Sequence, residues 1–169
     1  FLPHSYPLAN QLTTKEDIVG IVSIASGLLV TTKGKPLIAG GTDPSAMSLV
    51  EIDANLPNSN KRSLVDMGEY TLYASPDGLV IASNSGVSLV TQQIFTRDQW
   101  QDYYPENIEA YEYEGKYLGF TWDGSDSSTK KGFIFDPRGQ KNAFVNLDFY
   151  ATAGFNDREN DELYLVIGG

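Results

Sequence analysis

The 169-residue chain has 41% hydrophobic and 12% aromatic residues, which suits one folded domain with a core and excludes a disordered protein. Its formal net charge of -10 and pI near 4.4 make nucleic acid a poor general partner, because phosphate backbones are repelled. The absence of cysteine excludes disulfides and thiolate metal sites. We expect no membrane span, because serine and glycine interrupt the longest apolar stretches.

The first 17 residues predict an irregular arm, since Pro3, Pro7 and Asn10 punctuate them. The arm holds His4, the single histidine of the chain. A Ser-His-Asp or Cys-His arrangement, or a histidine-based metal site, would depend on His4 in a segment with no strand or helix to orient it. We therefore interpret His4 as incidental.

Residues 18–169 predict a single all-β repeat domain. Short apolar runs rich in Val, Ile, Tyr and Phe alternate with turn residues, which is typical of antiparallel sheet. Hairpin turns are predicted at Lys33-Gly34, Asp77-Gly78 and Glu114-Gly115. The predicted strands are 20–27, 28–32, 36–39 and 48–52 in a first set, 63–66, 70–74, 79–82 and 87–90 in a second, 108–113, 117–122, 132–135 and 143–147 in a third, and a fourth set from near Phe149 to 162–167.

Four leucines mark the repeat, one in the second strand of each set: Leu28, Leu72, Leu118 and Leu165, at spacings of 44, 46 and 47 residues. A four-strand unit that returns every 40–50 residues or so, roughly as here, is typical of propeller blades. One four-stranded sheet cannot cover its own two faces, so each unit stacks on its neighbours. We predict a propeller-like fold of three blades and part of a fourth. The alternative is a β-sandwich, which also alternates strands and turns.

One short helix interrupts the strands. Residues 96–99 fit a capping box, Phe95 and Trp100 occupy the two positions of a hydrophobic staple, and Pro105 ends the helix. We therefore expect both rings to serve local packing. A shorter helical turn is predicted over residues 43–47, with an aspartate cap followed by proline.

Acidic residues are the other candidates for chemistry. The loop 123–126 offers oxygen ligands for Ca²⁺, but it lacks the alternating acidic ligands and the distal glutamate of a calcium loop, so we interpret it as a solvated turn. We interpret the acidic loop 156–161 as a solvated turn as well. Glycosidase chemistry needs two carboxylates, and we expect most of those on or beside strands to point to water. We predict no catalytic, cofactor-binding or metal site. The strand-associated carboxylates are Asp66, Glu109, Glu112, Asp136 and Asp148.

Aromatic residues gather in one stretch of the third set. Cross-strand packing around a tight turn accounts for them. The alternative is an exposed aromatic stripe that binds glycans or proteins. These residues are Tyr103, Tyr104, Tyr111, Tyr113, Tyr117, Phe120 and Trp122.

Four segments, 61–68, 73–80, 95–100 and 113–120, resemble a family of tailed-phage and prophage virion proteins, and the string Phe-Thr-Arg-Asp-Gln-Trp at 95–100 is the most specific. More distantly, the strand order resembles the tail-hub or packaged-DNA stabilisation proteins, which carry propellers. The resemblance covers residues 17–140 or so. It implies a virion component on the tail side, made in the bacterial host cytoplasm, with other virion proteins as partners. It supplies no catalytic residues.

Our first functional hypothesis is therefore a non-catalytic structural virion protein that acts through protein-protein contacts. Because the sequence starts at Phe1 and ends on an apparent strand, we expect either a piece of a longer protein or a homo-oligomer that pairs its open edge. The alternative is a glycan-binding or glycan-cleaving propeller module that recognises a host surface. A third reading, a cellular interaction propeller, depends on the repeat period alone.

Overall fold

The computed structural model describes residues 10–25, 27–43, 45–139 and 144–167. It contains three four-stranded antiparallel sheets, one two-stranded sheet and one short α-helix. Each sheet is built from strands that follow one another in sequence, in the order β1-β2-β3-β4, β5-β6-β7-β8, β9-β10-β11-β12 and β13-β14. The described strands form no closed barrel. The fold is all-β and propeller-like, as the sequence predicted.

The observed strands follow the predicted sets closely. The described part of the arm, residues 10–17, contains no strand, while His4 lies outside the described residues. The strands are β1 (Ile18–Ile24), β2 (Gly27–Thr32), β3 (Leu37–Gly40) and β4 (Ser48–Glu51) in sheet 1; β5 (Val65–Asp66), β6 (Thr71–Ser75), β7 (Gly78–Ser83) and β8 (Gly86–Leu89) in sheet 2; β9 (Glu109–Tyr113), β10 (Lys116–Thr121), β11 (Lys131–Phe135) and β12 (Phe144–Leu147) in sheet 3; and β13 (Ala151–Asp157) and β14 (Glu162–Ile167) in sheet 4.

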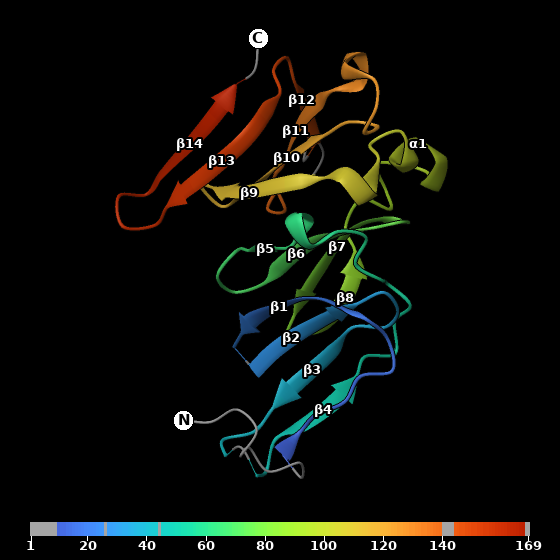
Figure 1. Cartoon of the computed structure of the whole chain (residues 1–169), viewed down its shortest axis with the longest axis vertical. Coiled ribbons are helices and arrows are strands. Elements are labelled where there is room, and N and C mark those ends of the chain that lie inside the picture. The colour runs from blue at the N-terminus through green and yellow to red at the C-terminus, as the bar shows by residue number, and fades with distance from the viewer. Residues whose placement is uncertain (1–9, 26, 44, 140–143, 168–169) are drawn as a thin grey trace.

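Sheet 1 (blue) lies at the lower end of the molecule, sheet 2 (green) lies above it, and sheet 3 (yellow to orange) lies at the upper end with sheet 4 (red) beside it (Figure 1). The first strands of sheets 2, 3 and 4 lie next to each other, because β5 contacts β9 and β9 contacts β13. Apolar side chains fill the space between successive sheets, which is how a four-stranded unit covers its faces. The clusters are Ile24 and Leu29 with Tyr73, Val80 and Ala82 between sheets 1 and 2; Leu72, Ala74 and Leu79 with Tyr117, Phe133 and Phe135 between sheets 2 and 3; and Leu118 and Phe120 with Ala151, Leu163 and Leu165 between sheets 3 and 4.

The four repeat-marking leucines do lie in the second strands, but two of them are out of register. Leu72 and Leu118 face the next sheet, as predicted for equivalent positions. Leu28 is 39% exposed on the opposite face of β2, and its neighbour Leu29, 0% exposed, occupies the equivalent position. Leu165 packs back against sheet 3 rather than forward. A shift of one residue reverses the face of a strand, so the prediction was wrong at these two leucines.

The short helices position segments between the sheets. Helix α1 (Arg97–Gln101) has the predicted capping box, with Thr96 accepting from Gln99. The 3₁₀ turns η3 (Lys61–Ser63), η4 (Pro105–Asn107) and η5 (Ser127–Thr129) lie in connecting segments. In the predicted turn at residues 43–47, Asp43 accepts a hydrogen bond from the backbone of Ser45, while residue 44 lies outside the described residues.

The rings of the predicted staple join sheets 2 and 3. Trp100 is fully buried, and its indole N–H donates to the Ser75 carbonyl at 2.8 Å. Phe95 lies at 6.3 Å from Trp100 and at 4.7 Å from Phe144, measured between ring centroids. Local packing is therefore confirmed as the role of these rings.

Candidate functional site

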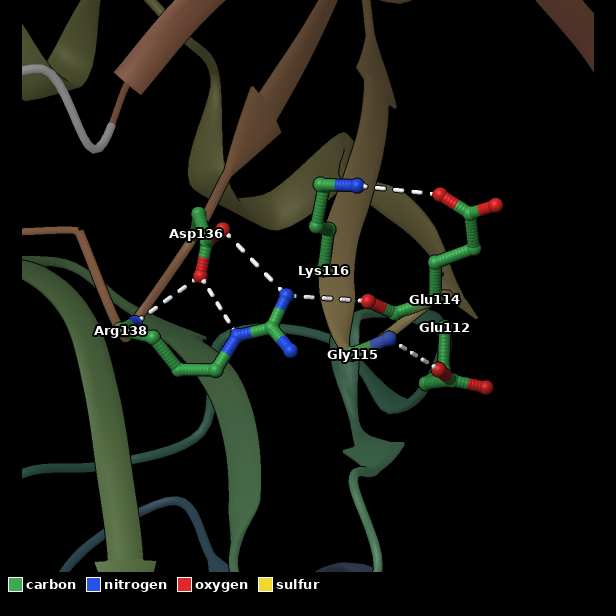
Figure 2. Close-up of polar contacts among 6 residues, drawn as sticks. All are labelled: Glu112, Glu114, Gly115, Lys116, Asp136 and Arg138. Carbon is green, nitrogen blue, oxygen red and sulfur yellow. Dashed lines mark hydrogen bonds and ion pairs between the residues drawn. The ribbon is translucent and has the colours of Figure 1, made fainter.

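Two of the candidate carboxylates hold a turn. Glu112 accepts the backbone N–H of Gly115 at 2.8 Å, and Asp136 pairs with Arg138 at 3.1 Å (Figure 2). Arg138 also donates to the Glu114 carbonyl at 3.0 Å. Both central residues of this β9–β10 turn have positive φ, 51° at Glu114 and 74° at Gly115, as its tight geometry requires. The hydrogen bond from Arg138 lowers the pKa of Asp136, so this group is a fixed anion in a structural role.

The other three strand-associated carboxylates do not gather into one site. Asp66 accepts from the Gly68 backbone and lies 3.5 Å from Arg158, while Asp148 is exposed. Glu109 is half-buried, as are Asp66, Glu112 and Asp136. The side chains of Glu109, Asp66 and Asp136 remain 27%, 30% and 29% exposed. Half-burial here comes with hydrogen-bond partners, because a partly desolvated carboxylate needs them.

The two acidic loops hold themselves together, as predicted for solvated turns. Asp123 accepts the backbone N–H groups of Asp126 at 2.6 Å and Ser125 at 2.8 Å, and these bonds lower the pKa of its carboxyl. Asp157 accepts from Asn160, chiefly through the side-chain amide at 2.8 Å, which lowers its pKa likewise. Among the described residues no group of three or more His, Cys, Asp or Glu side chains could hold a metal ion.

A cavity of about 530 Å³ lies between the 3₁₀ turns η3 and η4 and sheets 3 and 4. Its walls come from segments that are far apart in the sequence. They are Asn60 and Arg62 around η3, Glu106 and Asn107 on η4, Glu109 at the start of β9, Trp122 just after β10, and Tyr150 just before β13. The loop around η5 closes the remaining side with Ser127 and Lys130.

Glu109 is held firmly in the cavity wall. The Arg62 guanidinium donates to one of its oxygens at 2.9 Å, and the Tyr111 hydroxyl donates to the other at 2.5 Å. Desolvation, together with this hydrogen bond to Glu109, raises the pKa of Tyr111. Glu109 is therefore a structural anion whose charge is offset by Arg62.

Other polar groups of the wall keep hydrogen-bonding capacity. Asn107 uses its amide N–H to hold the Trp122 carbonyl at 3.0 Å. The Glu106 carboxylate, the Trp122 indole N–H and the Tyr150 hydroxyl make no hydrogen bond with another described residue. The Lys130 ammonium lies 5.2 Å from the centre of the Tyr150 ring. The cavity therefore offers donors, acceptors and two aromatic rings together.

A second surface feature is the outward face of sheet 4. Phe155, Tyr164 and Val166 lie on one face of β13–β14 and are 65%, 55% and 60% exposed. Tyr164 is the register equivalent of Leu29, Leu72 and Leu118, all of which face the next sheet. We call the set Ala153, Phe155, Tyr164 and Val166 the terminal face.

Comparison with known proteins returned no relative. No protein-family model matches this sequence, and no curated protein does either. No helix among the described residues is long and apolar enough to cross a membrane.

The aromatic residues of the third set lie partly in the cores between sheets and partly in the cavity wall. Tyr117 and Phe120 are buried in the inter-sheet cores, and Tyr103 packs within 5.6 Å of Phe133, so cross-strand and inter-sheet packing is confirmed for them. Trp122 lines the cavity instead. Its partner in the wall, Tyr150, was missed, because nothing in the sequence links it to Trp122 across the intervening strands β11 and β12.

Proposed function

We propose that this protein is a non-catalytic structural component of a phage virion that acts through protein-protein contacts. The observation that supports it best is the terminal face. The equivalent face of sheets 1, 2 and 3 is covered by the sheet that follows, whereas Phe155 and Tyr164 point to solvent. Contiguous exposed apolar side chains rimmed by polar residues mark interaction surfaces.

The occupant that fits this face is a β-sheet of a neighbouring virion protein. Among the described strands β14 pairs only with β13, whereas β2, β6 and β10 each pair on both sides. Among the described residues, sheet 4 thus has an unpaired edge strand and an uncovered face. A partner that continues the series of stacked sheets would pair with the edge strand and cover the exposed face.

Charge defines one border of the partner surface. The tip of the β13–β14 hairpin carries carboxylates at Asp157, Glu159, Asp161 and Glu162 beside the single base Arg158. Arg158 already faces Asp66 at 3.5 Å. The partner therefore carries lysine or arginine where it meets this tip, because complementary charge steers docking and fixes orientation.

The virion assignment within this proposal depends on the resemblance of residues 61–68, 73–80, 95–100 and 113–120 to phage structural proteins. The acidic balance of the whole chain, at a net charge of -10, favours protein partners over packaged nucleic acid. Its location would be the virion, after synthesis in the host cytoplasm.

The proposal is tested by photo-crosslinking in assembled particles. Tyr164 is replaced by a photoreactive benzoyl-phenylalanine in the producing strain, and Tyr113, an exposed tyrosine of β9 outside the terminal face, is replaced likewise as the control. After irradiation of gradient-purified particles, we expect a crosslink to a second virion protein from position 164 and none from position 113.

Absence of the chain from purified particles would overturn the virion assignment. Presence without any crosslink from position 164 would remove the terminal face from the proposal. A crosslink between two copies of this chain would reassign the face to a homo-oligomeric contact.

A further inference from the structure

We propose that the cavity between η3, η4 and sheets 3 and 4 binds a neutral sugar ring of an oligosaccharide. This inference is independent of the terminal face, since no cavity residue named below belongs to it. Its volume of about 530 Å³ lies in the range of small-molecule sites, roughly 300–1,000 Å³. One or two sugar units fit a space of that size.

The free hydrogen-bonding groups of the wall select a ligand rich in hydroxyls. The Glu106 carboxylate only accepts, the Trp122 indole N–H only donates, and the Tyr150 hydroxyl does both. A hydroxyl group satisfies each kind of partner, because it donates one hydrogen bond and accepts two. A sugar ring presents several hydroxyls at fixed spacing, so it meets all three groups at once.

The two aromatic rings supply the apolar part of the site. The face of an aromatic ring carries partial negative charge, which attracts the polarised C–H groups of a sugar. Tyr150 is held in place edge-on to Phe120, with the ring planes at 84°, and Lys130 lies over its ring. These contacts fix the Tyr150 ring before any ligand arrives, which lowers the entropy cost of binding. The backbone carbonyl of Trp122 accepts a hydrogen bond from Asn107, which holds the backbone that carries the second ring.

Charge in the wall favours a neutral ligand over an anionic one. Two bases, Arg62 and Lys130, face two acids, Glu106 and Glu109, so the ionisable groups sum to zero. Arg62 pairs with Glu109 at 2.9 Å, so its positive charge is already offset. The strongly negative charge of the whole molecule also repels anions.

The fluorescence of the protein offers a direct measurement, because the chain has only two tryptophans. Trp100 is fully buried, while Trp122 lines the cavity. We would titrate the protein with neutral trisaccharides (maltotriose, cellotriose, mannotriose and triacetyl-chitotriose) and, as a separate arm, with sialyllactose. We expect a saturable change in fluorescence with at least one neutral trisaccharide, confirmed by calorimetry.

Two variants place the binding in the cavity. Glu106 is exposed, so Glu106→Ala leaves folding intact and should weaken the affinity about tenfold by removing a charged acceptor. Trp122→Phe should abolish the fluorescence response while calorimetry still reports weaker binding. Glu159→Ala removes an equally exposed carboxylate from the β13–β14 tip and should bind as the unmodified protein does.

Three results would overturn the inference: no saturable response to any neutral trisaccharide at millimolar concentrations, binding of sialyllactose alone, or equal affinity in Glu106→Ala and Glu159→Ala. None of these results bears on the terminal face, so a failure here is distinguishable from a failure of the proposed function.

Discussion

At the scale of single residues, buried tyrosine hydroxyls tie the sheets to the segments that connect them. The Tyr73 hydroxyl donates to the Leu56 carbonyl at 2.8 Å, and the Tyr117 hydroxyl donates to the Ser63 carbonyl at 2.9 Å. Both rings are fully buried. Since Ser63 belongs to η3 and Tyr117 to β10, the second of these bonds joins a connecting segment to sheet 3.

Replacement of Tyr117 by phenylalanine isolates that bond. Tyr117→Phe keeps the ring but leaves the Ser63 carbonyl without this donor, so we expect a loss of about 1–3 kcal/mol in the free energy of unfolding. Denaturant titration measures it. Tyr113→Phe, at an exposed ring, should change stability by less than about 0.5 kcal/mol. Equal effects from the two variants would mean that the Tyr117 hydroxyl contributes nothing.

The same tyrosines make the protein sensitive to alkali. Burial raises the pKa of Tyr73 and Tyr117 in the folded state, whereas in the unfolded chain both ionise near their usual value of about 10. Below that pH neither state loses these protons and stability is constant. Above it the unfolded state alone loses them, so the free energy of unfolding falls as pH rises.

Urea titrations across that range should show this decline, and tyrosinate absorbance should rise together with unfolding. The variant with both Tyr73→Phe and Tyr117→Phe should decline less steeply. An unchanged slope in that variant would assign the alkaline sensitivity to other groups.

At the scale of elements, local signals in the sequence identified the strands, the tight turns and the helix cap. The capping box at Thr96 and the turn at Glu114-Gly115 can each be predicted from a few adjacent residues, because their hydrogen bonds and backbone angles are local. Register could not be read this way. Leu28 and Leu29 are both apolar, so apolar and polar residues do not alternate at this point of β2. The sequence therefore does not show which of the two side chains faces the core.

The cavity was beyond sequence reasoning for a related reason. Arg62 and Lys130 belong to two short basic pairs that are unremarkable in sequence, and only the stacking of sheets brings them to one wall. Of the predicted candidates, Glu109 and Trp122 do line it, but each was considered separately. Proximity across blades depends on how the sheets pack, which no local pattern encodes.

The neighbouring leucines of β2 test the register directly. Leu29→Ala opens a hole in the core between sheets 1 and 2 and should lower the free energy of unfolding by about 2–5 kcal/mol. Leu28→Ala, at a 39% exposed side chain, should cost less than about 1 kcal/mol. Thermal or denaturant unfolding of the two variants measures the difference. A larger loss from Leu28→Ala would reverse the assigned faces of sheet 1.

At the scale of the whole molecule, stability is shared between sheets through their faces. Sheets 2 and 3 are covered on both sides by apolar clusters, whereas sheet 4 is covered on one side. In repeat architectures stability is roughly a sum of unit and interface contributions, so a unit with one interface opens first.

Amide hydrogen exchange should therefore be graded along the molecule. We expect the paired amides of β13–β14 to exchange faster than those of β6, β7 and β10, with protection of β13–β14 rising when a partner covers the terminal face. Uniform protection across the sheets would instead indicate a single cooperative unit, and it would contradict the graded picture.

The order of strands within each sheet also bears on how the chain folds during synthesis. Every described strand pairs with the strand just before or just after it in sequence, so sheet 2 needs only the span from Val65 to Leu89 to complete its hydrogen bonds. Short loops close quickly and at small entropic cost. Each sheet can thus form as it leaves the ribosome and then provide a ready surface on which its successor condenses.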